Sequence, residues 1–295
     1  MTVLQSIRNI PAYVRAGTQM SAGQIFTKVA RRATGITSPA LSRLELLSDK
    51  KLGDPARVGN LFTFLEDQAR EHAGWPGIEL EGRNVMEIGC GALGGFSPVA
   101  MARGAASYAG IEPMWDDRVF FHPATDRKYL GPIANQLGMD ITALKSAISD
   151  RCRFYKGTLE DWKPAQKADL VLSLSCLEHI SDLDTAARNL RRLLPENAAQ
   201  IHLVNFSNHR SKTSPFDLIY SMPPDAFKKR YGNLINLLRP KDVLVAFQRA
   251  GFNARFVPVS VRHDALDAVT VAPFWQDAYD RDELAVRTGF LLVDG

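Results

Sequence analysis

The chain has 295 residues, 45% of them hydrophobic and 23% charged, and a formal net charge of +4. This composition is ordinary for a soluble globular protein, and without an 18-residue apolar run or a compact apolar leader we expect neither a membrane span nor a signal peptide. The three cysteines are too far apart for a zinc or iron–sulfur cluster, and the mild positive charge argues for no specific nucleic-acid partner, so we expect a cytoplasmic protein without a metal site.

Residues 1–80 are predicted to form a mostly helical N-terminal extension. Apolar residues between Val58 and Ala69 recur at helical spacing, and Gly74 ends the pattern. Shorter apolar patterns precede them. We expect this extension to act as a lid that shapes the substrate site, and a homodimer through it is a further expectation.

After residue 80 the pattern changes to alternating strands and helices. Short apolar runs predict strands over 83–89, 107–113, 152–157, 168–175 and 199–206. Helices are predicted over 94–105 and 181–196, the second with a capping box of Ser181 and Asp184 at its start. Such alternation favours an α/β fold with a parallel sheet covered on both sides, whose ligands bind beyond the carboxyl ends of the strands.

A glycine-rich loop follows the first of these strands. Gly89, Gly91 and Gly94 spell G-x-G-x-x-G, a pattern that usually binds the pyrophosphate of a dinucleotide. Glu87 lies two residues before the first glycine, where a carboxylate would repel a pyrophosphate. A ligand with ammonium and sulfonium charges, such as S-adenosylmethionine, suits this loop better, and the glycines let the backbone pass close to it.

Glu112 ends the second strand, 21 residues after Gly91. An acidic residue at this distance binds the ribose hydroxyls of an adenine cofactor. Glu112 therefore supports an adenine-ribose cofactor, and it does so for nicotinamide and S-adenosylmethionine alike.

Three motifs in order carry a family resemblance: "MEIGCG", "GIEP" and "DLVLSLSCLEHISDLDTAARNLRRLLPEN". Together they resemble class I S-adenosylmethionine-dependent methyltransferases over about residues 80–260. The region 205–252 resembles small-molecule and sugar methyltransferases of glycan and secondary-metabolite gene clusters. The resemblance implies a Rossmann-like, doubly wound, seven-stranded and mostly parallel sheet over 81–295, with substrate-pocket insertions at 114–150 and 206–240.

The resemblance also implies a set of cofactor-binding residues. Glu87 and the glycine loop are expected at the methionine part of the cofactor, and Thr158 stands where the family commonly has an acidic residue for the adenine, with Glu160 as a substitute. Residues after the fourth strand are expected to pass beneath the cofactor. The full set is Glu87, Gly89, Cys90, Gly91, Glu112, Thr158, Leu159, Ser175 and Cys176.

Candidate catalytic residues follow the fourth and fifth strands. Glu178 and His179 lie just past the fourth strand and His209 lies in the loop after the fifth, so all three are expected to act as acid–base groups at the methyl acceptor. The alternatives are a capping role for Glu178 and a packing role for His179. Asn236 and Arg239 match a family pattern and are expected to bind substrate, with a structural role for Arg239 as the alternative.

These observations predict an S-adenosylmethionine-dependent methyltransferase that O-methylates a hydroxyl of a sugar or another small metabolite, a glycan or glycosylated metabolite among its candidate substrates. N-methylation of a small amine is the nearest alternative. An NAD-dependent oxidoreductase and a non-catalytic scaffold that binds S-adenosylmethionine are alternatives of other classes.

Overall fold

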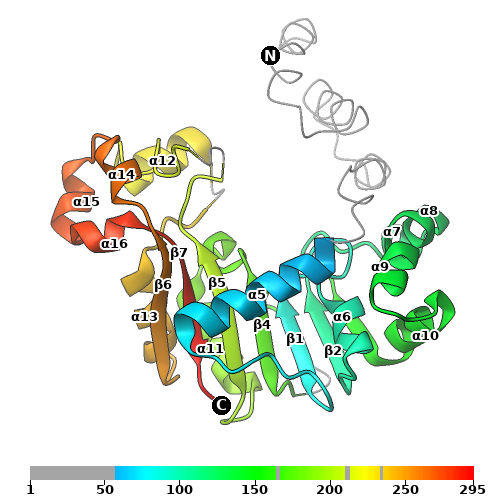
Figure 1. The fold of residues 1–295 in the computed structure, drawn as a ribbon. Coiled ribbons are helices and arrows are strands. Elements are labelled where there is room, and N and C mark those ends of the chain that lie inside the picture. The colour runs from blue at the N-terminus through cyan, green and yellow to red at the C-terminus, as the bar shows by residue number, and fades with distance from the viewer. Residues whose placement is uncertain (1–56, 164–166, 210–212, 233–234) are drawn as a thin grey trace, which may run out of the picture.

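The sheet that organises the chain has seven strands in the order β3-β2-β1-β4-β5-β7-β6 (Figure 1). The computed structural model describes residues 57–163, 167–209, 213–232 and 235–295. Strands β1 to β5 pair in parallel, and β7 is antiparallel to both of its neighbours, β5 and β6. The strands are β1 (Asn84–Ile88), β2 (Ser107–Ile111), β3 (Cys152–Tyr155), β4 (Leu170–Leu174), β5 (Ala199–Asn205), β6 (Ala254–Val261) and β7 (Val286–Val293). The predicted seven-stranded, mostly parallel sheet is confirmed.

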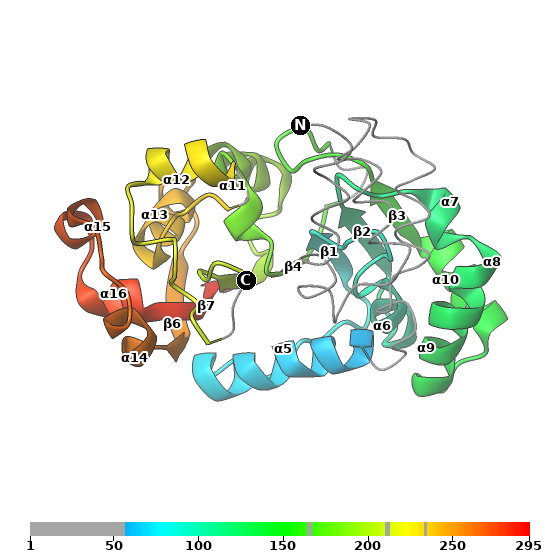
Figure 2. The same ribbon diagram turned by 90° about the horizontal axis from the view of Figure 1, so that it is seen from above.

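Helices cover both faces of this sheet (Figure 2). One face carries α5 (Arg57–Ala73), α6 (Ser97–Ala102), α9 (Gly131–Gln136) and α10 (Ile141–Arg151), and the other carries α11 (Leu183–Leu193) and α13 (Pro240–Arg249). Strand β1 shows why both faces are filled: Val85 packs with the first group, whereas Met86 and Ile88 pack with the second. Successive side chains of a strand point to opposite faces, so an apolar run needs cover on both.

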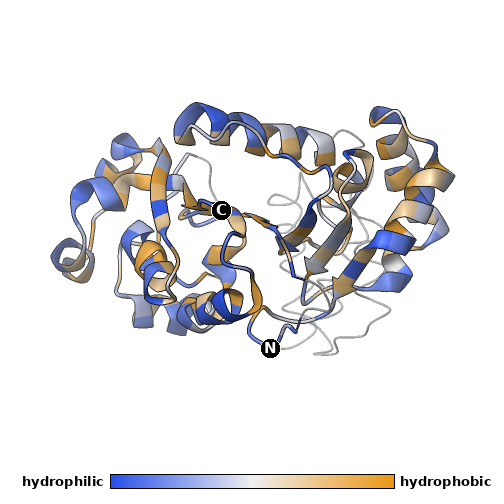
Figure 3. Cartoon of the chain, turned by 90° about the horizontal axis from the view of Figure 1, so that it is seen from below, coloured by the Kyte–Doolittle hydropathy of each residue, from blue (hydrophilic) through white to orange (hydrophobic). Residues whose placement is uncertain are grey.

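Helix α5 is the described part of the N-terminal extension, since residues 1–56 lie outside the described range. Its apolar residues Val58, Phe62, Leu65 and Ala69 are buried in the same core as α6. Hydrophilic and hydrophobic residues alternate along α5 in Figure 3, as expected of a helix with one buried face. Helix α5 therefore packs against one face of the sheet as part of the helical layer that covers it.

Two predicted helix starts are corrected by the structure. Helix α11 begins at Leu183, and its N-cap is Asp182, whose side chain accepts a hydrogen bond from the Thr185 amide at 2.9 Å, so the capping box predicted with Ser181 is wrong. Asp182 satisfies an amide that has no partner within the helix. Helix α6 begins at Ser97, later than the predicted residue 94, because turns of the glycine-rich loop come first.

The segment 114–150 folds mainly as short helices beside the β2–β3 edge of the sheet. It contains α7 (Asp117–Phe120), α8 (Pro123–Thr125) and a π-helical turn (Asp126–Leu130) before α9 and α10. Trp115 stacks on Phe154 of β3 with ring centroids 4.0 Å apart, and Tyr129 is buried in the core shared with α5.

A third apolar cluster forms a helical lobe, built from α12 (Pro224–Tyr231), α14 (His263–Asp267), α15 (Pro273–Ala278), α16 (Arg281–Ala285) and the chain before α12 (Figure 1). Its largest buried side chain is Trp275, which packs edge-on against Tyr220. Within the described ranges, no helix has both the length and the apolar character that crossing a bilayer requires.

Arg239 joins the helical lobe to the sheet. Its side chain is 1% exposed, and its guanidinium donates to the backbone oxygens of Leu237 and Phe206 and to the Tyr220 hydroxyl. The rings of Phe206 and Tyr220 lie within 5.4 Å of the guanidinium carbon. A cation held by carbonyl oxygens and aromatic faces has a structural role here.

We therefore expect Arg239→Ala to lower the free energy of unfolding by about 3 kcal/mol, because the Phe206 and Leu237 oxygens lose their donor in the interior. Urea unfolding measures the change. Arg249→Ala is the control, because this arginine is exposed at the end of α13, the helix that Arg239 precedes, and the variant should stay within about 0.5 kcal/mol of the wild type. Equal stability of the two variants would contradict this role.

Candidate active site

The glycine-rich loop and the turn after β4 lie side by side at the carboxyl edge of the sheet. Strand β1 pairs in parallel with β4, with Ile88 opposite Ser173. Gly89 has a φ of +77°, and a Cβ there would lie 2.6 Å from the Cys176 sulfur. A side chain at Gly89 is thus excluded by its conformation and by its neighbour from β4.

Glu87 stabilises the glycine-rich loop through hydrogen bonds of its carboxylate. Its side chain is buried, and Oε2 accepts hydrogen bonds from the Phe96 amide at 2.7 Å and the Tyr108 hydroxyl at 2.5 Å. Burial raises the pKa of Glu87 to about 7, although both hydrogen bonds oppose the rise. The sequence predicts that Glu87 contacts the methionine part of a cofactor. The hydrogen bonds of Glu87 in the structure are made with Phe96 and Tyr108.

Glu112 joins the glycine loop to the end of β2. Its Oε2 accepts from the Gly91 amide at 3.0 Å, and its Oε1 accepts from the Met114 amide at 2.9 Å. Gly91 has a φ of +68°, and a Cβ added at this position would have no other atom within 4 Å. An open cradle beside an acidic residue fits the predicted adenosyl cofactor.

The other predicted cofactor residues have varied surroundings. Cys90 is buried against Gly110, and Leu159 is buried in the core shared with α11. Thr158 is exposed, and its hydroxyl donates to Asp161 at 3.3 Å.

Ser175 and Cys176 connect β4 to the turn that follows. The Ser175 amide donates to the Leu203 oxygen of β5 at 2.8 Å, and Ser175 has a φ of +50°. Burial raises the pKa of the Cys176 thiol, which therefore stays protonated and is unsuited to act as a nucleophile.

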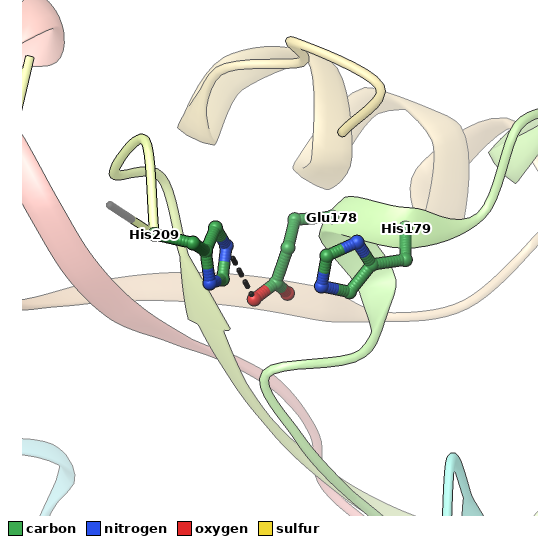
Figure 4. Close-up of side chains that lie close together, drawn as sticks. All are labelled: Glu178, His179 and His209. Atoms are coloured by element: carbon green, nitrogen blue, oxygen red, sulfur yellow. Dashed lines mark ion pairs between the residues drawn. The ribbon is translucent and has the colours of Figure 1, made fainter. Parts of the chain in front are cut away.

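Glu178, His179 and His209 come together beyond β4 and β5, and we call them the Glu–His–His cluster. Glu178 is 4% exposed, and its Oε1 lies 3.5 Å from Nε2 of His209. The two imidazole rings have centroids 5.1 Å apart. Figure 4 shows the carboxylate of Glu178 between the two rings. The three predicted catalytic residues are therefore neighbours in space.

The electrostatics of this cluster are set mainly by burial. No hydrogen bond of good geometry reaches either carboxylate oxygen of Glu178. Burial raises the pKa of Glu178 to about 8, although the backbone amides of Glu178 and Asn205 oppose the rise. Burial and the neighbouring His179 lower the pKa of His209, whose side chain is 30% exposed. Burial therefore favours the neutral forms of Glu178 and His209.

Asn236 fixes the turn that carries Glu178 and His179. Its side-chain amide donates to the backbone oxygens of Leu177 and Ile180 at 2.8 and 3.0 Å. Its backbone amide donates to the backbone oxygen of Glu178 at 2.7 Å. Asn236 thus supports the cluster from behind. Arg239, predicted to bind substrate, is enclosed in the core, and its contacts do not support that expectation.

A small pocket lies against the two histidines. It has a volume of about 150 Å³ and is lined by His179, Asn208, His209, Leu218, Phe227, Tyr231 and Ile235. Its apolar wall comes from α12 and the segments around it, within the predicted insertion 206–240. Residues 114–150 do not line this pocket. Sequence reasoning missed the four apolar lining residues because nothing in their local pattern separates them from core residues.

Left-handed backbone marks the same region. The described non-glycine residues with positive φ are Ser175, His209, Leu218 and Leu237, and two of them line the pocket. Each costs of order 1–3 kcal/mol of strain, which persists where surrounding contacts impose it and is common at functional sites. The loops that present the Glu–His–His cluster are therefore held in defined conformations.

Comparisons with known proteins give a family match. The model of the family described as "Methyltransferase domain" matches residues 44–255. A comparison with curated protein sequences finds no match.

Similar solved structures include the S-adenosylmethionine-dependent methyltransferase from Mesorhizobium loti, 19% identical over 75% of this chain and 93% of that chain, with a TM-score of 0.43. The N-methyltransferase NodS from Bradyrhizobium japonicum WM9 is 13% identical over 83% and 97% of the two chains, with a TM-score of 0.38. Magnesium protoporphyrin IX methyltransferase (ChlM) from Synechocystis PCC 6803 with bound SAH is 14% identical over 93% and 95%, with a TM-score of 0.43.

The buried Glu87 predicts a specific pH dependence of stability. Its folded-state pKa of about 7 lies above the ordinary 4.5, so its contribution to stability is fully present below pH 4.5 and is lost as the pH rises through 7. Glu87→Gln keeps an acceptor for Phe96 and Tyr108 but does not titrate. Relative to wild type, the variant should gain roughly 2–3 kcal/mol between pH 5 and pH 8 in urea unfolding.

Glu79→Gln, at an exposed position, is the control and should follow the wild-type pH profile. A stability difference between Glu87→Gln and wild type that does not change with pH would refute the assignment of this titration to Glu87.

Proposed function

The chain belongs to the family of methyltransferase domains and uses S-adenosylmethionine as its methyl donor, and on that premise we propose that it methylates a hydroxyl group of a small molecule. The observation that carries this proposal is the Glu–His–His cluster, two of whose members, His179 and His209, line a small pocket. Family membership also sets aside the NAD-dependent oxidoreductase alternative.

The cofactor site proposed from the sequence agrees with the open cradle at Gly91. Gly89 and Gly91 allow the chain to pass beneath the cofactor, and Glu112 provides acceptors for its ribose hydroxyls. S-adenosylmethionine supplies a methyl group on a sulfonium sulfur, which is an excellent leaving group. The protein's own task is then to place the acceptor in line with that group.

A hydroxyl acceptor explains the chemistry of the cluster. An alcohol is a weak nucleophile until its proton is removed, whereas a neutral amine needs little help. His179 and His209 both line the pocket, and Glu178 lies between them. Two imidazoles and a carboxylate at an acceptor site are suited to the removal of a hydroxyl proton.

The pocket limits the size and character of the acceptor group. A volume of about 150 Å³ holds on the order of one six-membered ring. The wall of Leu218, Phe227, Tyr231 and Ile235 is largely apolar, while His179, Asn208 and His209 provide polar contacts on the other side. We propose a ring-bearing alcohol, with a sugar or a hydroxylated secondary metabolite as the candidate class.

Three expectations from the sequence remain proposals beside this one: a homodimer, a cytoplasmic location, and N-methylation of a small amine as the alternative reaction. A non-catalytic scaffold is less favoured because Glu178 is buried without a well-formed hydrogen bond, His209 has a left-handed backbone, and both histidines line a pocket. Turnover of S-adenosylmethionine with any acceptor would exclude the scaffold.

The cofactor assignment predicts the effect of Glu112→Ala. Removing the acceptors for two ribose hydroxyls should weaken the binding of S-adenosylhomocysteine at least about tenfold, because hydrogen bonds to a charged group contribute roughly 1.5–3 kcal/mol each. Isothermal titration calorimetry measures the affinity, and Asp117→Ala, an exposed carboxylate on the adjacent α7, is the control. Unchanged affinity in a folded Glu112 variant would remove the ribose assignment.

The acceptor assignment predicts which substrates turn over and which variants fail. A panel of glycosides, cyclic alcohols and phenols, each paired with the corresponding amine, is assayed for the release of S-adenosylhomocysteine. With the alcohols, His179→Ala and His209→Ala should each lower turnover roughly 10²–10⁴-fold and leave cofactor affinity unchanged. His263→Ala, an exposed histidine of α14, should retain activity.

Turnover restricted to the amines, with near-normal rates in both histidine variants, would instead establish N-methylation.

A further inference from the structure

We propose that Glu178, His179 and His209 form a binding site for a divalent transition-metal cation beside the acceptor pocket. One nitrogen or oxygen from each residue lies within 4.8 Å of the others, and the separation between Oε1 of Glu178 and Nε2 of His209 is 3.5 Å. Ligand atoms bonded at about 2.1 Å to a tetrahedral cation lie roughly 3.4 Å apart. Small side-chain rotations therefore convert this cluster into a ligand set.

The carboxylate of Glu178 is the strongest sign of a missing partner. It is 4% exposed, and no hydrogen bond of good geometry reaches either oxygen, although the backbone amides of Glu178 and Asn205 lie near it. A buried polar group without a partner is costly, and native structures rarely leave one unexplained. Glu87, the other buried carboxylate of this sheet edge, accepts two short hydrogen bonds. A cation between Glu178 and the imidazoles would supply the partner that Glu178 lacks.

The geometry fits a cation better than a pair in which Glu178 orients an imidazole base. Such a pair needs a hydrogen bond of about 2.6–3.2 Å, and the 3.5 Å separation from His209 is longer. A cation uses all three side chains at once, and Figure 4 shows the carboxylate flanked by both rings.

The ligands are held in place by the contacts around them. Asn236 binds both ends of the turn that carries Glu178 and His179, and His209 has a left-handed φ of +56°. Hydrogen bonds and backbone conformations that fix the surrounding chain also orient metal ligands before a metal binds.

The donor set indicates the class of metal. Two imidazole nitrogens and one carboxylate oxygen favour Zn²⁺, Co²⁺ or Fe²⁺ over Mg²⁺ and Ca²⁺, which prefer oxygen alone. Three protein ligands leave a coordination position open, as in catalytic sites.

The role of this cation rests on the proposed function, whereas its binding does not. At the open position it would hold the acceptor oxygen and favour release of the hydroxyl proton to water. The oxygen then forms its bond to the methyl carbon as the carbon–sulfur bond breaks, and the electron pair of that bond stays on sulfur. The products are the methyl ether and S-adenosylhomocysteine.

Titration with Co²⁺ tests the site directly in the full-length protein, without an affinity tag and after treatment with a chelator. We expect one equivalent of Co²⁺ to produce visible absorption bands, Zn²⁺ to abolish them, and either metal to raise the melting temperature. His209→Ala and His179→Ala should each weaken Co²⁺ binding roughly hundredfold or more, as loss of a direct ligand exceeds the tenfold to hundredfold cost of losing an outer contact.

His263→Ala is the matched control, because His263 also lies near a carboxylate, with its Nε2 3.6 Å from Oδ1 of Asp282. His263 is exposed and is not part of the cluster. It should bind Co²⁺ as the wild type does, and S-adenosylhomocysteine binding verifies that every variant is folded. Folded wild-type protein that binds neither metal, or cluster variants that bind Co²⁺ with wild-type affinity, would overturn the proposal. Because no methyl donor or acceptor is present, the result stands apart from the fate of the proposed reaction.

Discussion

The parallel pairing of β1 with β4 is the constraint on which the candidate site depends. With Ile88 opposite Ser173, both strands end at the same level, and their loops leave the sheet side by side. Pairing of β4 with β5, with Leu174 opposite Leu203, adds the loop that carries His209. Three loops that are distant in sequence are thereby brought to one edge, which is where parallel sheets bind their ligands.

Two buried carboxylates at this edge have opposite surroundings. Glu87 is enclosed by donors from its own fold, so its burial stabilises the shape of the glycine-rich loop. Glu178 is equally buried, but no donor reaches its carboxylate with good hydrogen-bond geometry, and the proposed cation would complete its contacts. The same residue type thus has a structural task on β1 and, as we propose, a chemical one after β4, and the local supply of hydrogen-bond donors makes the difference.

The sheet could be predicted because its signals are local. Each of the first five strands is a short apolar run, and the G-x-G-x-x-G pattern from Gly89 to Gly94 requires no distant partner for its recognition. Strand β6 reads less clearly, because its residues are largely half-buried and it contains Pro258. The start of α11 was misplaced because Ser181 and Asp182 are both good caps, and only the backbone path decides between them.

The candidate site could be predicted in part. The positions of Glu178, His179 and His209 after consecutive strands indicated that they converge, since parallel strands end at one edge. Their common set of contacts was not predictable, because it depends on side-chain directions and on Asn236, which reaches the turn from 56 residues away along the chain. Spacing along the chain therefore gave no metal motif.

The placement of β7 has a consequence for the order in which the chain is assembled during synthesis. Strand β7 follows β6 in the chain but lies between β5 and β6 in the sheet. Strand β6 is at the edge of the sheet and pairs with β7. Until the ribosome has made β7, β5 and β6 each expose an unpaired strand edge, while β1 to β4 are already available to fold. Leu284 and Ala285, which complete the apolar cluster of the helical lobe, directly precede β7. The nascent chain can thus build its glycine-rich loop early, but the lobe that bounds the small pocket closes only after β7 has been synthesised.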